Sequence, residues 1–288
     1  MPKLVENQKY INKIYSPPTP PSESGNTDPP KAFSTSHFMI SKLKILGAEV
    51  VQKGVHWKEA DTFLREELLA HDEGGVYVPP FDHEDIWEGH STMIDEIEKQ
   101  MKDKGGYSAI VCSVGGGGLF CGLMEGLERH GRLRGGEEGD VKVLAMETIG
   151  ADSLSLSLRN GKLSRLPAIT SIATSLGATQ VAEKAFEWGQ RPEVKNLVVS
   201  DAEAAMASVY FAVDERVLVE AACSASIATA YNGTFSSLLS PGRTASEVAA
   251  LNVVLVICGG SNISPSVIEE YRQKYSNDEV VMQKFHHG

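Results

Sequence analysis

Basic residues are scarce in this chain of 288 amino acids. Lysine and arginine together number 27 against 38 aspartates and glutamates, which gives a formal net charge of −11. No run of basic residues offsets that acidic excess. Because polyanions attract basic surfaces, the composition predicts no nucleic-acid partner and no anionic membrane partner.

Cysteines and long apolar segments are scarce as well. The four cysteines lack CxxC spacing and lie in apolar or glycine-rich segments, at Cys112, Cys121, Cys223 and Cys258. That pattern favours reduced thiols over a disulfide framework or a zinc site. The apolar run at 253–258 is far shorter than the roughly 20 residues of a membrane span, and the first ten residues hold no apolar signal core. We therefore expect a soluble, cytoplasmic protein.

Proline sets the first part of the chain apart. Residues 15–33 hold six prolines and almost no aliphatic side chains. Such a segment cannot bury enough apolar surface to offset the entropy lost on ordering. We expect residues 1–33 to form a disordered arm and the fold to begin near Ser34.

From Ser34 onward, short β-branched runs alternate with amphipathic helical patterns. The predicted strands lie at 48–52, 76–78, 109–114, 141–146, 197–199 and 252–258. The predicted helices include 39–46, 57–70, 119–130, 179–188, part of 221–239, and 264–275. Ser200 and Glu203 have the spacing of a capping box. Because crossovers between parallel strands must pass over the sheet, the alternation predicts an α/β fold with a doubly wound parallel sheet.

Four consecutive glycines stand between a predicted strand and a predicted helix, at Gly115, Gly116, Gly117 and Gly118. Without Cβ atoms, successive backbone amides can converge at the helix N-terminus, where the helix dipole favours a phosphate. The loop has neither the GK[ST] sequence of nucleoside-triphosphate loops nor GxGxxG spacing. Phosphate binding is the functional interpretation of this loop, and a flexible turn is the alternative.

The last predicted strand ends in small and polar residues, Cys258 followed by Gly-Gly-Ser-Asn. In open parallel sheets, ligands bind beyond the carboxyl ends of the strands. We therefore expect this strand end and the glycine loop to face one crevice. Taken alone, Cys258 would be interpreted as a small buried hydrophobic residue.

Several motifs in one order give the chain a family resemblance. SVGGGGL, AMETIGADS, PAITSIATSLGA and VICGGSNIS, with YVPPFDHEDIWEGHST at 77–92, resemble the serine/threonine dehydratases, or L-serine ammonia-lyases. The resemblance runs from about residue 34 to about residue 264. It implies a cytoplasmic homodimer with the two-domain, pyridoxal-phosphate-dependent fold of the tryptophan synthase β type. The implied reaction is a β-elimination that converts L-serine, and often L-threonine, to a keto acid and ammonia.

The resemblance also implies domains and cofactor contacts. Residues 34–78 would be a remnant of the small domain, and residues 79–288 the large domain that binds pyridoxal 5'-phosphate. The loop at 115–118 would hold the cofactor phosphate, and Cys258 would face the pyridine nitrogen. Phe81 would be an aromatic residue of the active site, and Ser175 would lie against one face of the ring. A core phenylalanine and a turn serine are the alternatives for the last two.

A site for a monovalent cation, K⁺ or Na⁺, is implied in the same way. Its ligands would be the Glu147 carboxylate and backbone carbonyls of Ala151, Leu176, Ala178 and Gly115. A bound cation would compensate a buried carboxylate. The alternative is that Glu147 forms a surface salt bridge.

The family's N-terminal section departs most from this sequence. It carries the Schiff-base lysine in an SFK-type motif and an SSGN-type loop, and we find no lysine here in that context. Ser24-Gly25-Asn26 spells SGN, but so close to the start of the resemblance that we treat it as coincidence. We expect the fold to be incomplete at its N-terminus, and the catalytic lysine stays unassigned. Ala221 and Ser224 are smaller departures, in a segment where the family tends to have Pro and Gly.

Two classes of function therefore remain open. One is an L-serine ammonia-lyase of amino-acid metabolism. The other is a catalytically inactive relative that binds a ligand or pairs with another subunit. A dinucleotide-binding oxidoreductase has only the αβ alternation in its favour, since no acidic residue is placed to bind a ribose after the glycines.

Overall fold

The computed structural model describes residues 13–16, 37–53, 57–137, 139–239 and 241–285. These residues fall into two units, Met1–Pro79 and Pro80–Gly288. Most of the arm predicted at 1–33, including Ser24-Gly25-Asn26, lies outside the described residues.

The first unit contains a two-stranded parallel sheet in which β1 (Lys13–Ser16) pairs with β2 (Glu49–Gln52). Its helical segments are α1 (His37–Ile45), α2 (Trp57–Phe63), the π-turn Leu64–Leu68 and the 3₁₀ turn Leu69–His71. The segment at 13–16 was predicted to be disordered, yet it is a strand. Isoleucine and tyrosine, which occupy positions 14 and 15, both favour strands.

The prediction of a strand at 76–78 is wrong. This segment has no strand geometry, and Val76 and Val78 are largely exposed. Two prolines follow at once, and proline cannot donate to a strand ladder. Tyr77 is instead held by its hydroxyl, which donates to Asp61 Oδ1 at 2.6 Å.

The second unit contains a four-stranded parallel sheet with the order β5-β4-β3-β6. Its strands are β3 (Ala109–Ser113), β4 (Lys142–Thr148), β5 (Val194–Val199) and β6 (Val253–Leu255). Ala109 lies opposite both Lys142 of β4 and Val253 of β6. Strands far apart in sequence therefore end at the same edge.

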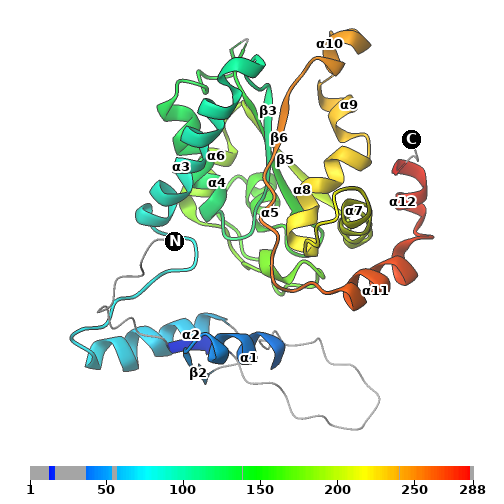
Figure 1. Ribbon diagram of the computed structural model, residues 1–288. Helices are drawn as coiled ribbons and strands as arrows, with labels where there is room; N and C mark the ends of the chain where they lie inside the picture. The colour runs from blue at the N-terminus through cyan, green and yellow to red at the C-terminus, as the bar shows by residue number, and fades with distance from the viewer. Residues whose placement is uncertain (1–12, 17–36, 54–56, 138, 240, 286–288) are drawn as a thin grey trace. The chain divides into compact units, whose positions relative to one another are not determined.

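Helices cover both faces of this sheet (Figure 1). One side carries α3 (Glu84–Met101), α4 (Gly118–Arg129) and α6 (Glu183–Gly189). The other carries α7 (Asp201–Asp214), α8 (Ala221–Tyr231) and α9 (Thr234–Leu239). The remaining segments are the 3₁₀ turn Lys102–Lys104, α5 (Ser153–Asn160), the 3₁₀ turn Thr174–Leu176, α10 (Ala245–Ala249), α11 (Pro265–Tyr275) and α12 (Glu279–Lys284). The doubly wound α/β fold is confirmed. Within the described part of the chain, no helix is long and apolar enough to cross a membrane.

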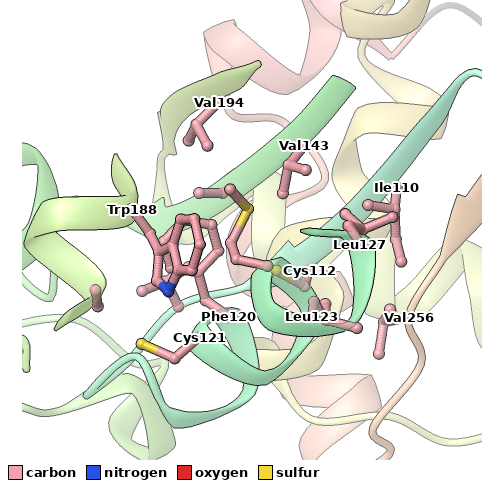
Figure 2. Packing of buried hydrophobic residues seen from close by; sticks show 14 of the residues in the cluster. Ile110, Cys112, Phe120, Cys121, Leu123, Leu127, Val143, Trp188, Val194 and Val256 are labelled. Atoms are coloured by element: carbon pink, nitrogen blue, oxygen red, sulfur yellow. The ribbon is translucent and has the colours of Figure 1, made fainter. Parts of the chain in front are cut away.

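Close packing of α3 on α4 depends on small residues. A Cβ at Gly122 would lie 2.5 Å from the Trp87 carbonyl oxygen, and a Cβ at Gly126 would lie 2.7 Å from Ile94. The two helix backbones therefore approach more closely than larger residues would allow. Phe120 and Leu123 of α4 point into the buried cluster seen in Figure 2.

The strand predicted as buried at 252–258 is shorter and less buried than expected. Only Val253–Leu255 forms β6, and all three of its residues are half-buried, whereas the first four residues of β3 are buried. The sheet order explains the difference, because β3 has strands on both sides and β6 is at the edge. An apolar run shows that a segment packs against something, but not whether it has one neighbour or two.

The predicted capping box at the start of α7 is confirmed. Ser200 Oγ accepts from the Glu203 amide at 3.1 Å, and the Ser200 amide donates to Glu203 Oε2 at 2.9 Å. Lys284 Nζ of α12 reaches Glu203 Oε1 at 2.9 Å. The cap therefore also attaches the C-terminal helix to α7.

Burial predicts a large difference between two isoleucine substitutions. Ile110 is fully buried on β3, so Ile110→Ala should cost about 2–5 kcal/mol of unfolding free energy. Ile149 is 62% exposed, so Ile149→Ala should change it by less than about 0.5 kcal/mol. Urea unfolding of the two variants measures both values, and equal losses would contradict the assigned core.

Candidate functional site at the carboxyl edge of the sheet

The four glycines form the connection from β3 to α4. Gly117 is the N-cap of α4, with a left-handed φ of 98°, and no side chain caps this helix. The amides in the first turn of any helix lack intrahelical acceptors and stand at the positive end of its dipole. These amides and this dipole suit a phosphate group.

Phe81 lies directly against this loop. A Cβ on Gly116 would come within 2.2 Å of the Phe81 ring, and one on Gly118 within 2.9 Å of the Phe81 carbonyl oxygen. That carbonyl also accepts a hydrogen bond from Trp87 Nε1 at 2.9 Å. The structure thus brings together two predicted site elements, and it gives the glycines a packing role in addition to any role with phosphate.

The loop at 258–262 lies at the same edge, because β6 pairs in parallel with β3. Its two glycines adopt left-handed φ values, 77° at Gly259 and 102° at Gly260. The Asn262 side chain donates from Nδ2 to Ser175 Oγ at 3.2 Å. Two predicted ring contacts, Cys258 and Ser175, are thereby linked through one loop.

A third segment, the 3₁₀ turn Thr174–Leu176, joins these two loops. A Cβ on Gly115 would lie 3.1 Å from Leu176 Cα, so the glycine loop touches the backbone of this turn. Ser175 in the same turn contacts Asn262. The site is therefore assembled from the connections that follow β3 and β6, together with this turn between α5 and α6.

Cys258 is exposed, whereas the neighbouring thiols of Cys112 and Cys223 are buried. Burial around the sulfur, and then the negative charge of Glu220, raise the pKa of Cys258 above its ordinary value. The Cys223 sulfur accepts a hydrogen bond from the Gly259 amide at 3.3 Å. At neutral pH the Cys258 side chain is a neutral thiol.

Glu147 is fully buried at the end of β4. Its Oε1 accepts from the Leu154 amide at 2.8 Å, and its Oε2 accepts from the Ser155 amide at 2.8 Å and from Asn196 Nδ2 at 2.9 Å. Desolvation raises the pKa of Glu147 to about 7 despite these donors. The alternative of a surface salt bridge is wrong, because the carboxylate is inside the protein and bound to amides.

The other residues predicted to bind a cation lie in neighbouring turns. Ala151 bridges to Thr148 next to Glu147, and the Leu176 carbonyl accepts the Ala178 amide at 2.7 Å. The Ser153 hydroxyl is buried close by in sequence, with no hydrogen-bond partner among the described residues. An unpaired buried hydroxyl leaves an acceptor for a small ion or a water molecule.

The sequence did not reveal Asp201 and Glu220, two carboxylates that hold these turns. Asp201 Oδ1 accepts from Ser171 Oγ at 2.5 Å and from the Ile172 amide at 3.2 Å, which fixes the segment leading to Ser175. Glu220 Oε2 accepts from the Asn262 amide at 2.9 Å. A sequence clue existed only for Glu220, which directly precedes the segment that contains Ala221 and Ser224.

The two departures at Ala221 and Ser224 have structural explanations. Ala221 begins α8. Ser224 Oγ donates to the Ala204 carbonyl of α7 at 2.5 Å, so it ties the two helices together. The Ser224 hydrogen bond does not involve the loop at 258–262.

A cleft of about 740 Å³ opens elsewhere, between the end of α3, the turn at Gly105 and Gly106, and the residues that follow α4. It lies next to the amino end of β3. Arg132 forms an ion pair with Glu98 in this cleft, and His130 Nε2 contacts Asp95 Oδ1 at 2.7 Å. None of the predicted site residues lines this cleft.

Comparison with known proteins identifies the class. Residues 30–259 match the family described as pyridoxal-phosphate dependent enzyme. The chain belongs to this family, and its fold is that of the second fold type of these enzymes.

Individual relatives narrow the class further. The chain is 40% identical over 245 residues to the L-serine dehydratase/L-threonine deaminase of Bos taurus, covering 85% of this chain and 72% of the relative. It is 39% identical over 237 residues to an L-serine dehydratase of Saccharomyces cerevisiae, covering 79% and 68%. Its structure is similar to a fungal L-serine ammonia-lyase from Rhizomucor miehei, with a TM-score of 0.72, 33% identity, and coverage of 84% of this chain and 72% of that one.

Two glycine substitutions test the packing of the loop. Gly116→Ala should destabilise the protein by about 1–3 kcal/mol, because the new Cβ would overlap the Phe81 ring. Gly89→Ala, inside α3 with open space around it, should stabilise it by about 0.5–1 kcal/mol. Thermal and urea unfolding measure both changes, and a neutral Gly116→Ala would place Phe81 away from the loop.

Proposed function

We propose that this protein is an L-serine ammonia-lyase, which converts L-serine to pyruvate and ammonia by β-elimination with pyridoxal 5'-phosphate as cofactor. The observation that carries the proposal is the uncapped start of α4 at the glycine loop, next to the loop that bears Cys258. The names of the relatives support the same reaction and extend it to L-threonine.

The site residues fit this cofactor. When bound, pyridoxal phosphate supplies an electron-accepting ring that stabilises negative charge at the substrate α-carbon. The amides at 115–118 would hold its phosphate, and Phe81 and Ser175 would lie against the ring. Cys258 would face the pyridine nitrogen.

The state of Cys258 matches the reaction type. A carboxylate at this place would stabilise a protonated pyridine, whereas a neutral thiol does not. The raised pKa of Cys258 keeps the thiol protonated at neutral pH. A less electron-withdrawing ring limits carbanion character and suits β-elimination over transamination.

A monovalent cation, K⁺ or Na⁺, forms part of the proposal. Glu147 would bind it together with carbonyls of Ala151, Leu176, Ala178 and Gly115. Support comes from the buried carboxylate and from the contact of Gly115 with Leu176. The ion would stabilise the charged form of Glu147 and link the turns at the sheet edge.

The lysine that would remove the substrate α-proton is not found in this sequence in its motif context. That observation favours the second candidate function for the chain by itself, a cofactor binder that lacks turnover or pairs with another subunit.

We also propose that the working protein is a homodimer located in the cytoplasm. Light scattering of the purified chain tests the homodimer.

Cofactor binding and turnover can be separated experimentally. We expect the purified chain to bind pyridoxal phosphate in equilibrium dialysis. With L-serine and K⁺ it should release pyruvate no faster than free cofactor does. The chain lacks the lysine in its motif context, and general acid–base catalysis by such a group contributes about 10²–10⁴-fold to the rate.

Two variants test the loop. Gly116→Asp should bind the cofactor more weakly than Gly116→Ala, since both add a Cβ and only the aspartate adds negative charge. Equal binding by these two variants would contradict the loop assignment, and turnover well above free cofactor would contradict the missing base.

Exchange of K⁺ for choline tests the cation site. We expect K⁺ to raise the melting temperature by about 2–4 °C at saturating concentration through preferential binding to the folded state. Glu147→Gln should abolish this response. Glu193→Gln is the matched control, because Glu193 is also fully buried and also accepts backbone amides, from Gly135 at 2.7 Å and Gly136 at 3.1 Å. A K⁺ response that survives in Glu147→Gln would rule out Glu147 as a ligand.

A further inference from the structure

Glu220 is a buried acid between the end of the α7–α8 connection and the loop at 258–262. Only 7% of it is exposed, and it is the N-cap of α8 without a side-chain bond to that helix. Its carboxylate turns to the loop instead, where Oε2 accepts from the Asn262 amide at 2.9 Å. Its own amide donates to the Gly259 carbonyl at 2.9 Å. One residue thus holds the loop at two points.

The loop is shaped to admit this carboxylate. A Cβ on Gly260 would lie 2.1 Å from Glu220 Cδ and 2.5 Å from its Oε2. Gly260 also has a φ of 102°, which side chains rarely adopt. The glycine therefore leaves the space that the carboxylate fills, so the position of the acid and the path of the loop depend on each other.

We propose that Glu220 is a positioning residue whose carboxylate fixes the loop at 258–262, and thereby holds the Cys258 thiol in its place. The same anchor sets the Asn262 side chain on Ser175. The inference rests on the proposed function only in assigning Cys258 and Ser175 to the cofactor ring.

The charged and titratable groups around the thiol agree with this role. Cys258 faces Glu220, Cys112 of β3 and Cys223 of α8, and burial raises the pKa of both neighbouring thiols. On the far side of Glu220, Tyr271 of α11 has a pKa raised to about 12, chiefly by burial, with Tyr275, Glu220, Asp201 and Glu270 as further causes. Lys274 of α11 is a cation that interacts with Tyr275 and Asp201. Glu220 is the charged group that acts on Cys258 itself.

The pH profile of Cys258 alkylation by iodoacetamide tests the electrostatic part. Cys258 is exposed and the other three cysteines are buried, so peptide mapping can follow it alone. Glu220→Gln keeps an oxygen that can accept from Asn262 but removes the charge. We expect its profile to shift to lower pH, with alkylation at pH 7.5 about threefold faster than in the wild type. Glu96→Gln, an exposed position on α3, should leave the profile unchanged.

Hydrogen exchange at the Asn262 amide tests the positioning part. Glu220→Ala removes the acceptor, and exchange should become roughly 10- to 100-fold faster, the value of one hydrogen bond to a charged group. Glu220→Gln should stay close to the wild type. A Glu220→Gln alkylation profile that superimposes on the wild type would overturn the proposal, as would unchanged exchange in Glu220→Ala. If Glu220→Ala does not fold, the alkylation profile of Glu220→Gln decides.

Neither measurement needs the cofactor. A chain that gives both expected results but does not bind pyridoxal phosphate would contradict the proposed function and leave the role of Glu220 intact.

Discussion

Parallel pairing of β3 with both β4 and β6 is the constraint on which the candidate site depends. The sequence separates β3 from β6 by well over a hundred residues, yet the ladder puts Ala109 opposite Val253. Because the strands run in the same direction, the chain leaves both of them at one edge. The glycine loop and the Cys258 loop are neighbours for this reason, and no direct contact between them is needed.

Glycine at this edge allows other segments to approach the backbone closely. Phe81 occupies the space that a side chain on Gly116 would need, and Glu220 occupies the space next to Gly260. The incoming groups then determine the course of each loop, Phe81 through packing and Glu220 through a hydrogen bond. Flexibility is therefore a poor description of Gly116 and Gly260, since each is fitted to a particular neighbour.

Much of the fold was predictable from local pattern, because strands and helices alternate clearly between residues 109 and 275. The predictions of a strand at 76–78 and of full burial at 252–258 were wrong. Two prolines follow the first segment, and an apolar run such as the second does not show how many neighbours it has. Only the resemblance pointed to Phe81 and Ser175, whereas Cys258 also stood at the end of a predicted strand. Asp201 and Glu220 escaped detection because an acid at the start of a helix usually faces solvent. Their hydrogen-bond donors lie in segments about 30 and 40 residues away, Ser171 and Ile172 for Asp201 and Asn262 for Glu220, which a local pattern cannot contain.

Backbone amides also explain where negative charge is accepted at this edge. Several helices begin there, and most of their first turns are already satisfied. The first turn of α5 donates to Glu147, that of α7 to its own capping box, and that of α11 to Ser264. The first turn of α4 contains no acid, and its N-cap glycine offers no side chain. No side chain therefore caps the positive end of α4, at an edge that carries buried carboxylates. An anion placed at the start of α4 gains the helix dipole and amides that no side chain caps, and four successive glycines there leave room for a phosphate.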